Sequence, residues 1–385
     1  MVLRTFFWLM LITAAGHASA ATLTERQYRT LERLQNLLAQ SRTAEVIAAT
    51  EGIEAGSGDL GAALQLQIRA QALQMEERDA LAAEDLRRAL ATEALPDDRA
   101  MAVAISLGQI ETTLERYDAA REVLLPYATD DSFPDIARVI LAVTYLQQAR
   151  WQDALPWISA ATTAAEGKQI PEGWLAMRLS AEYQSTQYQA AAQTLQRLIT
   201  YDPENQTYWM QLAGMYQLLN QPDRQLATLE LAQTTGVPLD DNGRRVLASL
   251  MLQRGIPERA ARQLASVNDS EGVRLRITAL RAAREFGQAA IALEQLSETE
   301  RNPAFLADAA RLQWMDGNCN EALRLAERSL EQAEEGAMMI LAGTCAKETG
   351  QYDQARILFQ RALAMPDVSV SARRWLDYLA ALGKL

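Results

Sequence analysis

Two short stretches near the C-terminus share one skeleton: "GNCNEA" at residues 317–322 and "GQYDQA" at residues 350–355. Each begins with glycine and ends with alanine, and the two lie 33 residues apart. Their third positions differ, because Cys319 stands where the later stretch has Tyr352. A skeleton that returns at a fixed interval indicates that one supersecondary unit is used several times.

The same interval continues toward the N-terminus. If each unit is a pair of antiparallel helices (a helical hairpin), a small residue is expected near the start of its second helix. Such a position recurs after 29 to 37 residues. An aromatic residue, a proline or Cys319 precedes it by three positions. Small residues let two helices approach closely, and aromatic residues fill the spaces between hairpins. The series is Ala120, Ala154, Ala191, Gln225, Ala260, Ala289, Ala322 and Ala355.

A helix–turn–helix period of about 34 residues is the length of the tetratricopeptide repeat, and these segments resemble that family. The segment at 208–238 matches it at Trp209, Leu212, Tyr216, Leu229 and Ala232, and the segment at 341–366 at Gly343, Gly350, Tyr352, Ala355, Phe359, Ala362 and Pro366. The resemblance implies an all-α fold, a right-handed α-solenoid of helix–turn–helix repeats.

The chain outside the regular repeats is organised around this solenoid. We expect a single continuous array, because no linker is long enough to demand an independent domain. The predicted parts are a signal peptide at 1–20, an N-terminal helical region with degenerate repeats at 21–100, the solenoid at 101–370 and a capping helix at 371–385.

Residues 1–20 have the pattern of a targeting segment. Arg4 precedes an apolar run at 6–12, and the segment ends in the small residues Ala18, Ser19 and Ala20. This pattern predicts a signal peptide that is cleaved after Ala20, and hence a periplasmic protein. The alternative is an uncleaved membrane anchor, for which the apolar run is short.

Cleavage changes the chemistry of the chain. It removes Arg4 and His17, the only histidine, and leaves 36 basic against 49 acidic residues, a formal charge of −13. Such a charge argues against binding nucleic acid or anionic lipid. Without histidine, with two cysteines and with no phosphate-binding glycine motif, we expect no metal site, no cofactor and no enzymatic activity. A glycosidase that uses paired carboxylates is the remaining catalytic alternative.

The two cysteines are predicted to form a disulfide. Cys319 begins a second helix, Cys345 lies late in the following first helix, and antiparallel packing brings those two ends together. An oxidising compartment favours the bond. The alternative is a pair of buried free thiols used as small hydrophobic side chains.

The first helices of the repeats should line a concave face that binds a partner. Its basic C-terminal half suggests a partner segment that carries acidic groups, because arginine binds carboxylates with two parallel hydrogen bonds. The alternative is that these arginines pair with neighbouring acidic residues. The predicted partner-binding residues are Met210, Arg245, Leu252, Arg274, Arg281, Arg311, Trp314 and Lys347.

A narrower resemblance rests on three longer stretches. They are "YQAAAQTLQRLITYDPENQTYWMQLAGMYQLLNQPDRQLATLELAQTTGVP" at 188–238, "LASLMLQRGIPERAARQL" at 247–264 and "GNCNEALRLAE…AGTCAKETGQYDQAR…RRWLDYL" within 317–379. These stretches resemble the tetratricopeptide proteins that accompany TonB–ExbB–ExbD energy-transduction systems in Gram-negative bacteria. The resemblance implies a non-catalytic periplasmic scaffold, with TonB, ExbB and ExbD as partners.

Such a protein would work beside the inner-membrane motor that powers the uptake of iron complexes (siderophores) across the outer membrane, with peripheral contact to that inner-membrane complex. The alternative within the same class is a scaffold for outer-membrane assembly, cell-wall synthesis or secretion.

Overall fold

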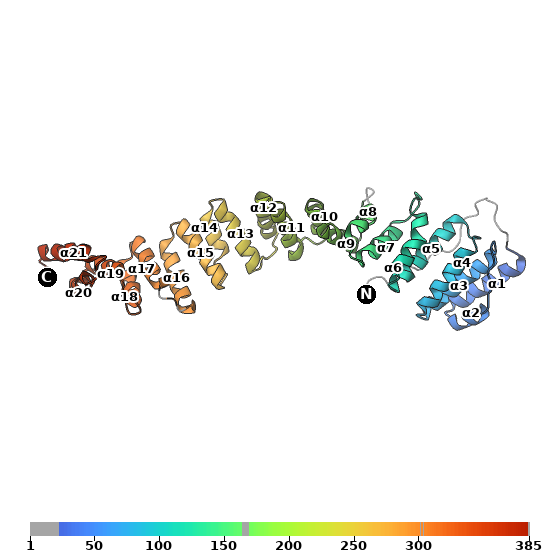
Figure 1. The fold of residues 1–385 in the computed structure, drawn as a ribbon, viewed down its shortest axis with the longest axis horizontal. Helices are drawn as coiled ribbons and strands as arrows, with labels where there is room; N and C mark the ends of the chain where they lie inside the picture. The colour runs from blue at the N-terminus through green and yellow to red at the C-terminus, as the bar shows by residue number, and fades with distance from the viewer. Residues whose placement is uncertain (1–22, 164–168, 301, 303, 384–385) are drawn as a thin grey trace. The chain divides into compact units, whose positions relative to one another are not determined.

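The computed structural model describes residues 23–163, 169–300, 302 and 304–383. The predicted signal peptide at 1–20 lies outside the described residues. Within them the chain forms 21 α-helices and one short 3-10 helix, and the described part contains no β-strand. The expected all-α solenoid of helix–turn–helix repeats is confirmed (Figure 1).

The chain divides into two compact units, Met1–Thr194 and Leu195–Leu385, called here unit 1 and unit 2. The helix α10 (Tyr188–Tyr201) crosses this boundary. The other helices of unit 1 are α1 (Glu25–Ala39), α2 (Thr43–Ala49), α3 (Leu60–Met75), α4 (Asp79–Ala91), α5 (Asp97–Thr113), α6 (Tyr117–Leu124), η1 (Leu125–Tyr127), α7 (Asp135–Leu146), α8 (Trp151–Thr162) and α9 (Glu172–Gln184).

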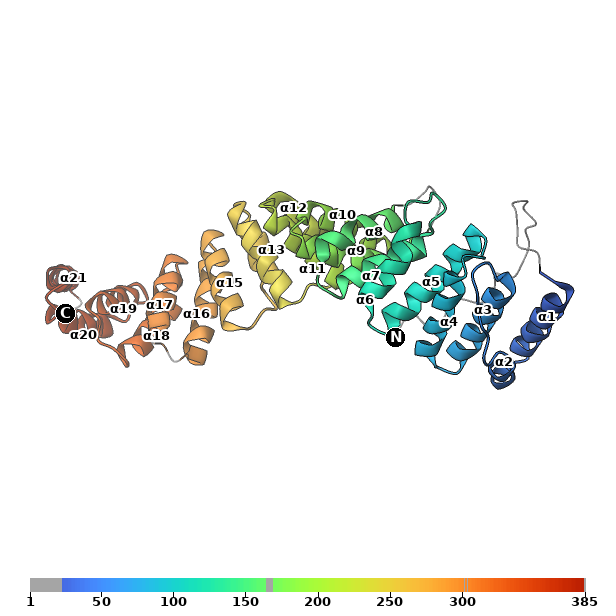
Figure 2. The same cartoon turned by 45° about the vertical axis from the view of Figure 1, so that its right-hand side comes forward.

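Unit 2 consists of five hairpins and a terminal helix. Each helix packs mainly on the helices before and after it in the sequence, as Figures 1 and 2 show for the order from α13 to α21. This nearest-neighbour packing is typical of solenoids. The helices are α11 (Gln206–Leu218), α12 (Pro222–Thr234), α13 (Asp241–Gln253), α14 (Pro257–Gln263), α15 (Ser270–Ala282), α16 (Phe286–Glu300), α17 (Ala304–Met315), α18 (Cys319–Leu330), α19 (Gly336–Glu348), α20 (Tyr352–Leu363) and α21 (Ser369–Ala381).

The glycine of the repeated skeleton is the left-handed residue of the turn inside each hairpin. Gly317 has φ +82° and Gly350 has φ +79°. The next backbone N–H closes the turn, since Asn318 donates to the Gln313 carbonyl at 2.9 Å. This is a common way to end a helix. Six other hairpins place a non-glycine residue at the same point with φ between +53° and +60°: Glu77, Glu115, Ala149, Thr186, Asn220 and Arg284.

The small residues of the repeat lie between the two helices of a hairpin. All seven alanines of the series are fully buried, as the sequence predicted. Where the second helix carries a larger side chain, the first helix carries glycine: Gly343 faces Phe359 so closely that an added Cβ would lie 2.5 Å from the ring. Phe359 in turn stacks on Trp375 of α21, with ring centroids 5.6 Å apart. The terminal helix thus covers the last hairpin.

Ion pairs connect the second helices of neighbouring hairpins in unit 2. Arg259 on α14 lies 2.8 Å from Glu230 on α12, and Arg324 on α18 lies 3.0 Å from Glu294 on α16. Hydrogen bonds from Arg324, followed by those from Arg328, hold the pKa of Glu294 below its ordinary value. These contacts join hairpin to hairpin rather than helix to helix within one hairpin.

Candidate interaction surface

The eight predicted partner-binding residues all lie on first helices of unit 2. Met210 comes from α11, Arg245 and Leu252 from α13, Arg274 and Arg281 from α15, Arg311 and Trp314 from α17, and Lys347 from α19. They divide into side chains that the fold itself uses and side chains left at the surface.

Three of the arginines pair with acidic residues further along the chain. Arg245 lies 2.7 Å from Asp269, Arg274 pairs with Glu300, and Arg311 lies 2.6 Å from Glu335. The partners stand 24 to 26 residues further along the chain. Asp269 and Glu335 directly precede the next first helix, whereas Glu300 ends α16, the second helix of the hairpin that contains Arg274. The charge of all three arginines is therefore largely compensated within the chain.

Two of these pairs are held by further contacts. The Gly272 N–H donates to Asp269, and this hydrogen bond, followed by the charge of Arg245, lowers the pKa of that carboxyl group. The Arg274 guanidinium lies 5.4 Å from the centroid of the Phe305 ring, an arrangement that favours a cation over an aromatic face. Both arginines are therefore ordered by their own chain.

Lys347 is also engaged within the fold. Its ammonium group lies 2.6 Å from Glu348 and 5.3 and 5.7 Å from the ring centroids of Trp375 and Tyr378. The hydrogen bond with Glu348 raises the pKa of Lys347. This lysine connects the last complete hairpin to the terminal helix.

Met210 and Leu252 are half-buried and pack against the core of unit 2. Arg281 and Trp314 remain at the surface. Arg281 is exposed and makes no ion pair with any residue that the structure describes, and Trp314 is 49% exposed. The predicted surface is thus reduced to these two side chains, on the neighbouring first helices α15 and α17.

Sequence reasoning missed other exposed side chains at the same end of the first helices. Met315 on α17 and Leu218 on α11 are about half-exposed, and Arg284 in the turn after α15 is exposed. Each stands at the last helical position or in the turn that follows it. For Met315 and Leu218 the signal in the sequence was an apolar residue directly before a turn.

The two cysteines lie together in unit 2, on α18 and α19. Both are free thiols in this structure, and their side chains are within hydrogen-bonding reach of each other. Burial, followed by the hydrogen bond with Cys319, raises the pKa of the Cys345 thiol well above its ordinary value. The disulfide stays a prediction.

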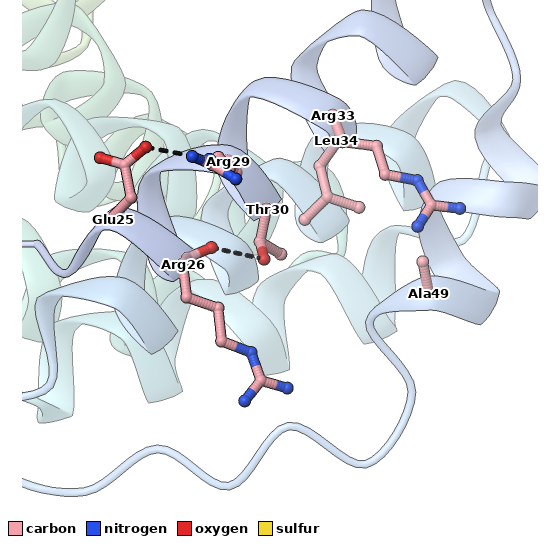
Figure 3. Close-up of a pocket in the computed structure, with 7 residues that line it drawn as sticks. All are labelled: Glu25, Arg26, Arg29, Thr30, Arg33, Leu34 and Ala49. Carbon is pink, nitrogen blue, oxygen red and sulfur yellow. Dashed lines mark hydrogen bonds and ion pairs between the residues drawn. The ribbon is translucent and has the colours of Figure 1, made fainter.

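A shallow hollow of about 560 Å³ lies along α1 in unit 1. Figure 3 shows its lining, with Glu25 paired to Arg29 at 2.9 Å and the Thr30 hydroxyl donating to the Arg26 carbonyl. Its single carboxylate has an arginine partner, so the hollow offers no pair of carboxylates for glycosidase chemistry.

Among the described residues, no cluster of three or more His, Cys, Asp or Glu side chains could hold a metal ion. In the same part of the chain, no helix is both long and apolar enough to cross a membrane.

The repeats define a class of protein. The model of the tetratricopeptide repeat family matches residues 107–168, 177–240 and 307–369. These three segments are therefore tetratricopeptide repeats, which confirms the resemblance to the general family. No curated protein matches the sequence.

Solved structures with the same kind of repeat are similar to this chain. A tetratricopeptide repeat protein from Parabacteroides merdae is 14% identical, with a TM-score of 0.34, over 63% of this chain and 97% of that one. The C-terminal part of a repeat protein from Cytophaga hutchinsonii is 15% identical, with a TM-score of 0.37, over 61% and 98%. The TPR2AB domain of yeast Sti1, in a complex with pHSP90, is 16% identical, with a TM-score of 0.32, over 62% and 93%. With TM-scores of this size, the family assignment rests on the matched repeats.

Proposed function

We propose that this protein is a non-catalytic protein-interaction scaffold. The observation that carries the proposal is the stack of helical hairpins in unit 2, of which residues 195–240 and 307–369 match the tetratricopeptide repeat and whose first helices leave Arg281 and Trp314 at the surface. Arginine and tryptophan are the residue types most often found at the energetic centre of protein interfaces. Tetratricopeptide repeats are generally modules that bind proteins, which is consistent with this role.

We further propose that the scaffold is an accessory component of a TonB–ExbB–ExbD system in the periplasm. Three features support this narrower function: the likeness of residues 188–238, 247–264 and 317–379 to the repeat proteins of those systems, the signal-peptide pattern of residues 1–20, and a charge balance unsuited to nucleic acid. In this role the protein would hold or position parts of the motor that drives iron-complex uptake.

The compartment is tested first. A C-terminally tagged full chain is expressed in a Gram-negative host, and the periplasmic fraction is analysed by mass spectrometry of the intact protein. We expect a species that begins at Ala21. Recovery of the unprocessed chain from the membrane fraction would instead support the uncleaved anchor.

The partners are tested by affinity purification of the same tagged protein from mildly solubilised envelopes, with mass spectrometry of the proteins recovered. An unrelated tagged periplasmic protein is the control. Specific recovery of TonB, ExbB and ExbD supports the proposal. If cell-wall, secretion or outer-membrane assembly proteins are recovered without TonB, ExbB and ExbD, the scaffold function is supported and the assignment to a TonB system is rejected. Recovery of no specific protein contradicts the scaffold itself.

A further inference from the structure

Three exposed apolar side chains of unit 2 lie at the C-terminal ends of first helices. Leu218 is the last residue of α11 and is 50% exposed, and Trp314 and Met315 are the last two residues of α17, 49% and 55% exposed. Single exposed apolar residues are ordinary on a protein surface. Exposed apolar residues that recur at the same end of the first helix in different hairpins indicate that these helix ends form one edge of unit 2.

Arg281 belongs to this edge because of its repeat position. It is the penultimate residue of α15, as Trp314 is of α17. The helix α16 packs on both α15 and α17, and packed helix axes lie about 8–10 Å apart. The two helix ends are therefore separated by at most about two such spacings, roughly 20 Å. A short peptide segment can reach both.

The charge on this edge is not compensated within the chain. Arg281 and Arg284 are exposed, and neither makes an ion pair with a residue in the described part of the chain. Arg245, Arg274 and Arg311 show the contrast, because each has an acidic partner within unit 2.

An acidic residue follows Trp314 and Met315 directly in the sequence. Asp316 follows α17 directly, but its carboxylate lies beside Gly287 at the start of α16. Asp316 forms no ion pair with Arg281 or Arg284 in the part of the chain that the structure describes, so it does not neutralise them.

We propose that the docking edge, defined as Arg281, Arg284, Trp314 and Met315, binds a segment of a protein partner that carries carboxylates next to bulky apolar side chains. The apolar residues of the partner would cover the Trp314 indole and the Met315 thioether, and its carboxylates would pair with the guanidinium groups of Arg281 and Arg284. This inference rests on the proposed scaffold function and names the chemistry of the partner that the scaffold takes.

The test uses the chain from residue 21 onward and two labelled peptides. One peptide consists of three Glu-Glu-Leu-Leu blocks, and the other has Lys in place of every Glu. Binding is followed by fluorescence anisotropy at low salt and again at high salt. We expect the acidic peptide to bind at least about tenfold more tightly than the basic one, and this preference to shrink as salt screens the charges.

Four variants locate the binding. Trp314→Ala and Arg281→Glu should each lower the affinity for the acidic peptide by about tenfold or more. The matched controls are Ile291→Ala, an apolar residue 54% exposed on the second helix α16, and Arg262→Glu, an exposed arginine on the second helix α14. Both controls should bind within about twofold of the parent chain. Circular dichroism melts check that all four variants remain folded.

Two results would overturn the inference. One is equal or absent binding of the two peptides by the folded parent chain. The other is a loss of binding in the control variants as large as the loss in Trp314→Ala and Arg281→Glu. If the envelope partner is still recovered with these two edge variants, the scaffold function stands and the docking edge is wrong. If the parent chain itself recovers no partner, the scaffold function fails separately.

Discussion

Replacing Gly343 by alanine should destabilise unit 2, although alanine is the better helix former. In the middle of a helix alanine is favoured over glycine by about 1 kcal/mol. Against this gain, the new Cβ of residue 343 would lie 2.5 Å from Cε1 of Phe359 and 2.8 Å from two more ring atoms. Contacts this short do not occur between real side chains, so one of the two helices has to move.

The ring of Phe359 has little room to yield. It is fully buried, and it is stacked on Trp375 with an interplanar angle of 3°. Overpacking a well-filled core costs about 1–3 kcal/mol. After the gain in helix propensity is subtracted, Gly343→Ala should lower the free energy of unfolding of unit 2 by up to about 2 kcal/mol.

Gly214 supplies the matched control in the same unit. It lies within the first helix α11, and an added Cβ there would meet no atom within 4 Å. Gly214→Ala should therefore stabilise unit 2 by about 1 kcal/mol. Both variants gain the same helix propensity, so the difference between them measures the clash alone, about 1–3 kcal/mol.

The assay is urea unfolding followed by circular dichroism, with hydrogen exchange of α19 and α20 to localise the effect. A second substitution, Phe359→Leu, should relieve part of the penalty of Gly343→Ala, because the smaller leucine side chain can shift away from the new Cβ more readily than the stacked ring. A double-mutant cycle then gives the coupling. If Gly343→Ala and Gly214→Ala stabilise the protein equally, the packing argument is wrong.

Three further predictions concern a turn, a thiol pair and a buried ion pair. Thr186 holds a left-handed conformation at φ +58°, so Thr186→Gly should stabilise unit 1 by roughly 1 kcal/mol in thermal melts; an unchanged or lower melting temperature would contradict this. Because the folded chain raises the pKa of Cys345 above its ordinary 9.0, the reduced protein should lose stability as pH rises above about 9. A Cys319–Cys345 disulfide would abolish this loss of stability at high pH, and in the chain-entropy model it would raise the free energy of unfolding by roughly 3–4 kcal/mol. If stability depends on pH in the same way before and after treatment with a reductant, the protein does not contain the bond. Asp85 is buried between Arg69 at 3.5 Å and Arg88 at 3.6 Å. Arg69→Met leaves Arg88 as the remaining partner of the buried carboxylate, so it should cost about 1–3 kcal/mol. Asp85→Asn, whose carboxyl pKa burial already raises, should cost less than about 1 kcal/mol; the reverse order in urea unfolding would refute this.

The repeat made the fold predictable because it constrains many positions at once. An alanine that must fit between two helices is needed in each hairpin, and the seven predicted alanines are all buried. The all-α class followed from the same series. The repeat can be recognised even where one unit is irregular, as at Gln225, because the units before and after it keep the spacing of about 34 residues.

The surface was less predictable, because exposure depends on contacts between hairpins. The sequence placed Arg245, Arg274 and Arg311 on first helices, but it could not reveal which acidic residues they meet. The partners of Arg245 and Arg311 directly precede the next first helix, and the partner of Arg274 ends the second helix of its own hairpin, so the pairs depend on how neighbouring helices are packed. Met315 was missed for a related reason, since a residue at a helix end can face either the core or the solvent until the turn direction is known.

The ion pairs that join neighbouring hairpins have a mechanical consequence. Within a hairpin of unit 2, the contact between helices is made by buried alanine, leucine and aromatic side chains, which salt does not weaken. Between hairpins, pairs such as Glu230 with Arg259 and Glu294 with Arg324 stand partly in solvent, where ions screen them. The same apolar core also continues from hairpin to hairpin. A rise in ionic strength therefore weakens only the exposed part of each contact between hairpins, and unit 2 should bend more easily in high salt while its core stays packed.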